Sequence, residues 1–193
     1  MRFWSERLPY LREFARTHRV LHIGPGRDDT PFGVTLDISE AVRPDVVHDL
    51  DVLPYPFPDS SFDAVYAFSV IEHVKEPLRV LEELHRILRP GGFVVILTPH
   101  FSDSASYIDP THRVHLSARS FDYLVEGTEL GRSYGFYSTA RYLVRQRLVM
   151  LQPGWARVPL LQRAANRWVD AYERLACFVV RGQGLYFELE AVK

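Results

Sequence analysis

The chain has 193 residues, of which 47% are hydrophobic, which fits one globular domain with a sizeable core and excludes wholesale disorder. Its single cysteine, Cys177, excludes an intramolecular disulfide. The sequence shows neither the apolar core of a signal peptide nor a window of about 18 uncharged apolar residues, so we expect a cytoplasmic protein without a membrane span. The net charge of −1 hides an asymmetry, because residues 131–181 hold nine arginines against Asp170 and Glu173 and therefore carry +7.

The first predicted element is a helix over residues 8–17. Apolar residues recur at helical spacing from Trp4 to Ala15, whereas Pro9 suits a first helical turn better than a helix interior. We expect residues 1–18 to form a helical cap over one edge of the site described next.

Three short apolar runs follow, and each is closed by turn formers or an acid. The runs span residues 20–23, 34–36 and 46–48, and the residues that follow them are Gly24 and Gly26, Asp37, and Asp49. Short β-branched runs of this kind predict buried parallel strands, whose carboxyl ends meet at one edge of the sheet. Glycines at that edge let a ligand approach the backbone, and Asp37 can accept hydrogen bonds from a ribose diol. The pattern predicts a nucleoside-cofactor site.

The link between the first two strands is short. Only seven residues, 27–33, separate Gly26 from Val34, whereas a parallel crossover normally needs about ten or more. We therefore expect a turn in place of the usual first helix. A dinucleotide fold would need that helix and a third glycine where Asp28 stands, so NAD and FAD are disfavoured.

The middle of the chain continues the alternation of strands and helices. The pattern predicts an extended loop over the three alternate prolines of residues 54–58, a fourth strand over 62–68 that ends at Ser69, a helix over 77–88, and a central parallel strand over 93–97.

Five ordered motifs make this pattern specific. They are His-Ile-Gly-Pro-Gly at 22–26, Leu-Asp-Ile-Ser at 36–39, Pro-Asp-Ser-Ser-Phe-Asp at 58–63, Ile-Glu-His-Val at 71–74 and Leu-Arg-Pro-Gly-Gly at 88–92. In this order they resemble the class I S-adenosylmethionine-dependent methyltransferases, over about half of the chain. The resemblance implies an α/β fold with a doubly wound, mostly parallel, Rossmann-like sheet, an antiparallel C-terminal strand, and S-adenosyl-L-methionine as the cofactor.

The short link after Gly26 departs from the general family pattern. It resembles a compact subgroup that also carries a Pro-His motif and an Asp-Pro-Thr-His motif after the fifth strand, here at residues 99–100 and 109–112.

The resemblance also implies roles for six residues around the cofactor. Gly24 and Gly26 lie against its methionine part, and Asp37 holds the ribose. Asp49 and Leu50 meet the adenine, and Ser69 flanks the cofactor. Asp51 is an alternative to Asp49. On a simpler interpretation, the glycines only make a tight turn and Asp37 only caps a strand.

Two further residues, Glu72 and His73, follow the fourth strand, at a position that faces cofactor or substrate in the family. The alternative is that His73 simply packs within a short helix.

The acceptor side is expected at residues 99–130. Its candidate catalytic residues are His100, Tyr107, Asp109, His112 and His115. Three interpretations remain open. A histidine takes the acceptor's proton, oriented by Asp109; His100, Asp109, His112 and His115 bind a divalent metal; or the segment is a turn with structural histidines. No metal is assigned, because loop spacing fixes no ligand geometry.

The last third of the chain contains a long insertion between its last two predicted strands, where the family usually has a short hairpin. Residues 142–151 predict a strand, and residues 185–191 alternate as a half-exposed antiparallel strand does. Between them, a helical insertion over 152–183 carries an apolar stripe (Leu161, Ala164, Trp168, Tyr172, Leu175 and Val179) opposite Arg163, Arg167, Asp170 and Arg174. Packing on the sheet is the first interpretation, followed by a dimer face and a membrane-surface contact; a substrate lid is a further alternative.

The sequence thus predicts a single domain with a cap at 1–18, a cofactor core at 19–98, an acceptor side at 99–130 and an insertion at 152–183. We expect methyl transfer from S-adenosylmethionine to a small-molecule, saccharide or lipid-linked acceptor, with an anionic group favoured by the basic stretch. A nucleic-acid acceptor is disfavoured, because that stretch lacks a stacking platform. A non-catalytic cofactor-binding module is the alternative from another class, and both a monomer and a homodimer fit.

Overall fold

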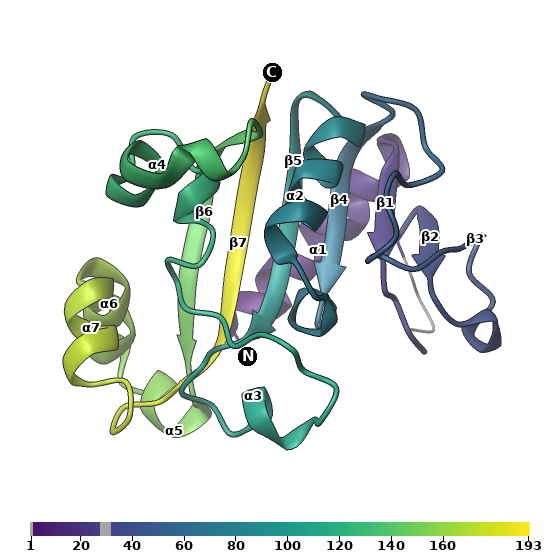
Figure 1. The fold of residues 1–193 in the computed structure, drawn as a ribbon. Helices are drawn as coiled ribbons and strands as arrows, with labels where there is room; N and C mark the ends of the chain where they lie inside the picture. Colours follow the sequence, from purple (N-terminus) through teal and green to yellow (C-terminus); the bar gives the residue numbers. More distant parts are fainter. Residues whose placement is uncertain (1, 28–31) are drawn as a thin grey trace.

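The structure, a computed structural model, describes residues 2–27 and 32–193 (Figure 1). Seven strands form one sheet in the order β3-β2-β1-β4-β5-β7-β6. They are β1 Val20–Ile23, β2 Val34–Asp37, β3 Val46–Val47, β4 Phe62–Phe68, β5 Leu88–Pro99, β6 Arg141–Leu151 and β7 Gly182–Val192. Strand β7 pairs antiparallel with both β5 and β6, and the pairs among β1 to β5 are parallel. The predicted fold class is confirmed.

Short helices connect and flank these strands. The α-helices are α1 Arg2–Thr17, α2 Pro77–Ile87, α3 Ala105–Ile108, α4 Glu129–Tyr134, α5 Pro153–Ala156, α6 Pro159–Arg167 and α7 Val169–Leu175, and the 3-10 helices are η1 Glu40–Val42, η2 Ile71–His73, η3 Asp122–Leu124 and η4 Gly135–Tyr137. None of the helices in the described part of the chain is long and apolar enough to cross a membrane.

Helix α1 differs from its prediction in extent and in place. It begins at Arg2 and continues through Pro9, so the helix tolerates the one backbone hydrogen bond that proline cannot donate. The Tyr66 hydroxyl donates to the carbonyl of Leu11 at 3.1 Å, and Phe14 packs edge-on against Phe93. The helix therefore covers the sheet face opposite α2, as Figure 1 shows, and not an edge of the cofactor site.

Helix α2 covers the other face. Leu81, Leu84 and Ile87 are fully buried in the larger of the two core clusters, because the apolar residues repeat at helical spacing. The helix ends at Ile87, and Leu88 already pairs with Phe62 in the sheet. The helix therefore ends one residue before its predicted end at Leu88, which is nevertheless fully buried.

The link between β1 and β2 is only partly visible. Residues 28–31 lie outside the described residues, and the described ends at Gly26, Arg27, Phe32 and Gly33 are turn, bend or irregular. The prediction of a turn in place of a first helix therefore remains a prediction for the centre of the link.

The insertion between β6 and β7 breaks into α5, α6 and α7 instead of forming one helix. The backbone leaves helical geometry at Trp168, which has φ −127° and ψ 54°. Because of this break, Tyr172 is buried whereas Trp168, Leu175 and Val179 are 62%, 85% and 72% exposed. The prediction that the whole apolar stripe packs on the sheet is wrong for these three side chains.

Candidate cofactor and acceptor site

A cavity of about 440 Å³ lies at the carboxyl ends of β1, β2 and β4. This is a usual size for a small-molecule or cofactor pocket, and it lies where open α/β sheets bind ligands. It is lined by Gly24, Asp37, Ile38, Asp49, Leu50, Asp51, Ser69, Val70, His73, Val74, Lys75 and Arg113. Five of the six cofactor residues expected from the sequence are therefore brought together, and the sixth, Gly26, adjoins them.

The turn after β1 depends on its two glycines. Gly24 and Gly26 have φ of +57° and +56°, in the left-handed region that favours glycine. The amide of Gly24 donates to the Leu36 carbonyl at 2.8 Å, which fixes the turn against β2. A Cβ at Gly24 would lie 2.3 Å from Cγ2 of Val70, whereas a Cβ at Gly26 would meet no atom of the described residues within 4 Å. Gly24 is therefore needed for space as well as for backbone freedom.

This contrast gives a paired prediction. Gly24→Ala should destabilise the fold by about 1 to 3 kcal/mol more than Gly26→Ala, because both variants strain the backbone but only the first overpacks against Val70. Urea unfolding of the two variants measures the difference. Equal destabilisation would show that Val70 moves away freely and that only the φ values matter.

Asp37 lies beside this turn. It is 8% exposed, and its carboxylate accepts hydrogen bonds from the amides of Gly26 at 3.1 Å and Ser39 at 2.9 Å. An ionised carboxylate has about four lone-pair positions, so two amides leave capacity for hydroxyl groups. Asp37 therefore both orders the glycine turn and presents acceptor oxygens to the cavity.

The two acids after β3 differ in their partners. One oxygen of Asp51 accepts from the Lys75 amide at 2.8 Å, and the other lies 3.9 Å from Lys75 Nζ. Asp49 accepts from the amide of Asp51 at 2.9 Å and lines the same cavity. Both oxygens of Asp51 thus interact with Lys75, just before α2. This favours Asp49 as the acid that meets a ligand. Leu50 adds an apolar wall beside it.

Ser69 ends β4 with an unusual backbone. Its φ is +50°, and its amide donates to the Leu97 carbonyl of the neighbouring strand at 2.7 Å. A non-glycine residue in this region stores strain, which recurs at functional sites. This conformation ends the strand at the cavity and turns the chain into η2.

Several residues of the cavity were not singled out from the sequence. Val70, Val74 and Lys75 follow Ser69 closely, so proximity to the fourth strand could have indicated them. Arg113 had no such signal. It reaches the cavity because the amides of Arg113 and Val114 donate to the carbonyl of Glu72 at 2.8 and 3.2 Å.

Comparison with known proteins agrees with this geometry. The methyltransferase domain family matches residues 33–96. A probable S-adenosylmethionine-dependent methyltransferase of Mycolicibacterium smegmatis is 34% identical over 104 residues, which are 51% of this chain and 40% of that protein. The crystal structure of an S-adenosylmethionine-dependent methyltransferase from Mesorhizobium loti superposes with a TM-score of 0.58 at 18% identity, covering 97% of this chain and 96% of that one. Residues 33–96 thus match the methyltransferase domain family, and the whole chain has the fold of a solved S-adenosylmethionine-dependent methyltransferase.

A third relative has a lipid substrate in its name. The phosphatidylethanolamine N-methyltransferase of Cereibacter sphaeroides is 43% identical over 53 residues, which are 28% of this chain and 26% of that protein. The matches to both curated relatives thus span less than half of those proteins' length. The cofactor of this methyltransferase family is S-adenosylmethionine.

The acceptor side predicted from the sequence does not gather all the residues proposed for it. His100 is fully buried and does not line the cavity. The Ser102 amide donates to His100 Nδ1 at 3.1 Å, so Nε2 carries the proton and donates to Glu173 Oε1 at 3.2 Å. A Cβ at Gly182 would lie 2.7 Å from the imidazole. These contacts correspond to the structural interpretation of His100 and not to a base above the transferred methyl.

Three other candidates lie on the surface. Tyr107 is 60% exposed and stacks on the exposed ring of His115, with 4.0 Å between ring centroids. Asp109 is exposed too, and hydrogen bonds from the Thr111 hydroxyl and amide hold the pKa of its carboxyl below the usual value. These residues do not line the cavity, so their catalytic role remains a hypothesis without geometric support.

His112 is the candidate that approaches the cavity. Its ring lies 4.6 Å from that of His73, which lines the cavity. Glu72 lies near both histidines and is 2% exposed, and burial raises the pKa of its carboxyl, partly opposed by hydrogen bonding and by the two histidines. Within the described ranges, the set that meets metal-ligand spacing is Glu72, His73 and His112, and not the four residues weighed from the sequence.

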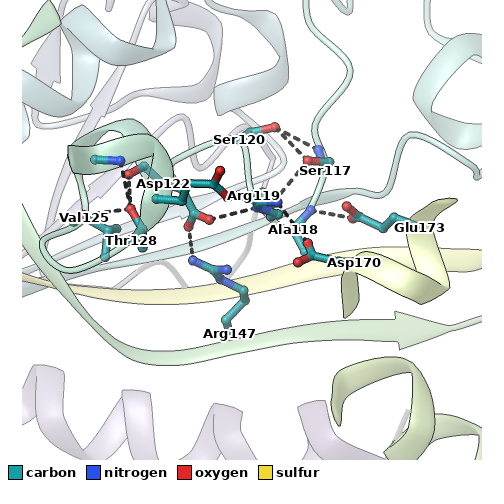
Figure 2. A network of polar contacts seen from close by, with 12 residues as sticks. Ser117, Ala118, Arg119, Ser120, Asp122, Val125, Thr128, Arg147, Asp170 and Glu173 are labelled. Atoms are coloured by element: carbon teal, nitrogen blue, oxygen red, sulfur yellow. Dashed lines mark hydrogen bonds and ion pairs between the residues drawn. The ribbon is translucent and has the colours of Figure 1, made fainter. Parts of the chain in front are cut away.

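A polar network ties the acceptor side to the insertion. Figure 2 shows Asp122 between two arginines, Arg119 and Arg147, with ion pairs to both. Arg119 also pairs with Asp170 of α7 at 3.1 Å, and Glu173 of α7 accepts from the Ala118 amide at 2.7 Å. Helix α7 of the insertion therefore holds residues 118–119 of the acceptor side in place.

Proposed function

We propose that the protein transfers the methyl group of S-adenosylmethionine to a lipid-linked or saccharide-type acceptor that carries an anionic group. The observation that supports the transfer is the convergence of Gly24, Asp37, Asp49, Leu50 and Ser69 on one cavity of about 440 Å³. S-adenosylmethionine supplies a methyl group on a sulfonium with a good leaving group. The protein then has to align the acceptor and the cofactor, and few catalytic side chains are needed.

Each part of the cavity suits one part of this cofactor. The buried carboxylate of Asp37 has lone pairs for the ribose hydroxyls. Leu50, Ile38 and Val74 provide apolar surface for the adenine, and Asp49 offers an acceptor for its amino group. The turn at Gly24 brings backbone close to the remaining space, where the methionine part fits.

The acceptor class is inferred from an exposed surface on the insertion. This insertion surface consists of Trp168, Leu175, Phe178 and Val179, each at least 62% exposed, together with the exposed arginines Arg163, Arg167 and Arg174. An apolar groove of about 280 Å³ between α6 and α7 adjoins it. Apolar side chains beside arginines complement a molecule with an acyl or prenyl portion and a phosphate or carboxylate. The phospholipid named for one relative is of that chemical kind.

The function is tested with methyl-labelled S-adenosylmethionine and fractionated cell extract. Label should appear in an organic-solvent fraction that contains anionic amphiphiles, and calorimetry should show cofactor binding. Cofactor binding without label transfer to any fraction would favour the non-catalytic binding module. Label recovered in nucleic acid would replace the proposed acceptor.

The insertion surface yields a prediction of its own. Replacing Arg163, Arg167 and Arg174 by Gln should weaken binding to anionic phospholipid vesicles about 100-fold, because each arginine near such a surface contributes about 1 kcal/mol of electrostatic attraction that salt screens. Vesicle co-sedimentation at two salt concentrations measures this effect. S-adenosylmethionine affinity should not change, since none of the three lines the cavity.

A matched variant controls for net charge. Arg16, Arg43 and Arg79 are also exposed but lie outside the insertion, and their replacement by Gln removes the same charge. If both triple variants lose vesicle binding equally, the attraction depends on net charge alone. If neither loses it, the insertion surface is only solvated.

A further inference from the structure

We propose that Glu72, His73 and His112 bind one divalent transition-metal ion, of the zinc or cobalt type, at the acceptor-side rim of the cofactor cavity. One ligand atom from each residue lies within 4.8 Å of the others. Tetrahedral zinc with bonds of 2.0–2.1 Å needs ligand atoms about 3.3 Å apart. Metal binding therefore requires the three ligand atoms to move closer together than this upper bound.

The carboxylate of Glu72 gives an independent indication. The side chain is 2% exposed, and Oε2 accepts a hydrogen bond from the Thr98 hydroxyl at 3.0 Å. The other oxygen, Oε1, is buried and has no hydrogen-bond partner among the residues that the structure describes. A buried carboxylate oxygen without a partner is costly, and a bound cation is one of the few groups that explain it.

The tautomer of His73 is fixed by its neighbours. The Thr111 hydroxyl donates to Asp109 Oδ1 at 2.6 Å, because an ionised carboxylate can only accept. The same hydroxyl oxygen lies 3.0 Å from His73 Nδ1 and must therefore accept a proton from it. Nε2 of His73 then carries the lone pair that a metal ion requires.

His112 is fixed in the same way. Its Nδ1 lies 3.1 Å from the carbonyl oxygen of Ser106, which can only accept, so Nδ1 carries the proton and Nε2 the lone pair. Metal-binding histidines in general donate their other ring N–H to a carbonyl or to a carboxylate. Both histidines here show such an arrangement, directly or through a hydroxyl.

The chain holds the three residues together through its backbone. Glu72 and His73 belong to η2, and the Glu72 carbonyl accepts the amides of Arg113 and Val114, which follow His112. A metal ion held by two imidazoles and one carboxylate keeps open coordination positions. Because His73 lines the cofactor cavity, these positions are available to an oxygen of the acceptor. This role rests on the proposed function, whereas metal binding itself does not.

The test titrates chelator-treated protein with Co²⁺, followed by its visible absorption, and with Zn²⁺, followed by calorimetry. The wild type should bind one equivalent of each, and Mg²⁺ should not compete, because imidazole is a poor ligand for it. Glu72→Gln and His112→Ala should each weaken binding at least about tenfold. Thr111→Val, which removes the acceptor for His73 Nδ1–H together with the hydroxyl hydrogen bond to Asp109, should weaken it about tenfold.

His115→Ala is the matched control. His115 belongs to the same segment, and its Nδ1 also contacts Ser106, through the hydroxyl at 2.9 Å, but it lies outside the cluster. Its removal should leave Co²⁺ binding unchanged. Circular dichroism verifies that each variant is folded, and a Zn²⁺-dependent rise of the melting temperature in wild type but not in His112→Ala gives a second readout.

Two outcomes overturn the proposal. One is no bound Co²⁺ or Zn²⁺ at stoichiometric protein concentration, and the other is wild-type affinity in both Glu72→Gln and His112→Ala. S-adenosylmethionine calorimetry on the same samples separates this failure from that of the proposed function. If the protein binds the cofactor but no metal ion, that result refutes only the metal site.

Discussion

Asp122→Ala should lower the free energy of unfolding by about 3 to 5 kcal/mol, the range seen when one partner of a buried ion cluster is removed. The Asp122 side chain is 4% exposed and pairs with Arg119 and Arg147, whose side chains are 24% and 21% exposed. Without the carboxylate, two poorly hydrated guanidinium groups face each other. For a chain of this size the melting temperature should fall by about 10 °C.

Asp170→Ala is the control for this prediction. Asp170 pairs with the same Arg119, but its side chain is 56% exposed, so water replaces it at little cost. We expect a change within about 1 kcal/mol. Chemical denaturation of the two variants compares them directly. A loss in Asp122→Ala as small as that in Asp170→Ala would show that both arginines reach solvent once the carboxylate is gone.

The parts of the fold that the sequence predicts well are those with local signals. The strands at Val20–Ile23 and Phe62–Phe68 are short β-branched or aromatic runs bounded by turn formers, and their bounds in the structure agree with the prediction. The cofactor residues follow such strands directly. Because the carboxyl ends of parallel strands meet at one edge, position in the chain is enough to bring Gly24, Asp37 and Asp49 together.

The insertion shows why the apolar pattern was not sufficient. The helical spacing of Leu161, Trp168 and Leu175 continues across Trp168, but the backbone bends there, and Leu175 faces solvent. Periodicity reports which residues share a face of a straight helix. Periodicity does not show where the helix breaks, nor which residues beyond the break are held inward, as Tyr172 is by the hydrogen bond from its hydroxyl to the Val180 carbonyl at 2.8 Å.

The contacts of the acceptor-side histidines could not be predicted from the sequence for a related reason. His100 and His112 look alike in the sequence, yet His100 meets Glu173, 73 residues away, and His112 meets Glu72 and His73. Neither partner can be read from spacing within the segment. Contacts between distant segments decide which histidine is structural and which lies near the cavity.

Asp37→Ala should weaken S-adenosylmethionine binding by about 1.5 to 3 kcal/mol, or roughly 10- to 150-fold, because charge-assisted hydrogen bonds in a partly dry site are lost. The structure adds a second reason. The carboxylate also holds the amides of Gly26 and Ser39, so its removal loosens the glycine turn beside the cavity. Asp37→Asn, which keeps one carbonyl oxygen as an acceptor, should lose less affinity than the alanine variant.

Asp45→Ala separates the loss of a strand-anchoring carboxylate from the loss of the cofactor contact. Asp45 accepts hydrogen bonds from the amide and the hydroxyl of Thr35, at 2.8 Å each, and Thr35 belongs to β2 as Asp37 does. Asp45 does not line the cavity. It should therefore retain cofactor affinity. Calorimetry with S-adenosylmethionine and with NAD compares the proteins, and NAD should not bind the unaltered chain appreciably. Unchanged affinity in Asp37→Ala would remove this carboxylate from the ribose site, because among the described residues Asp37 is the buried acid at the end of β2.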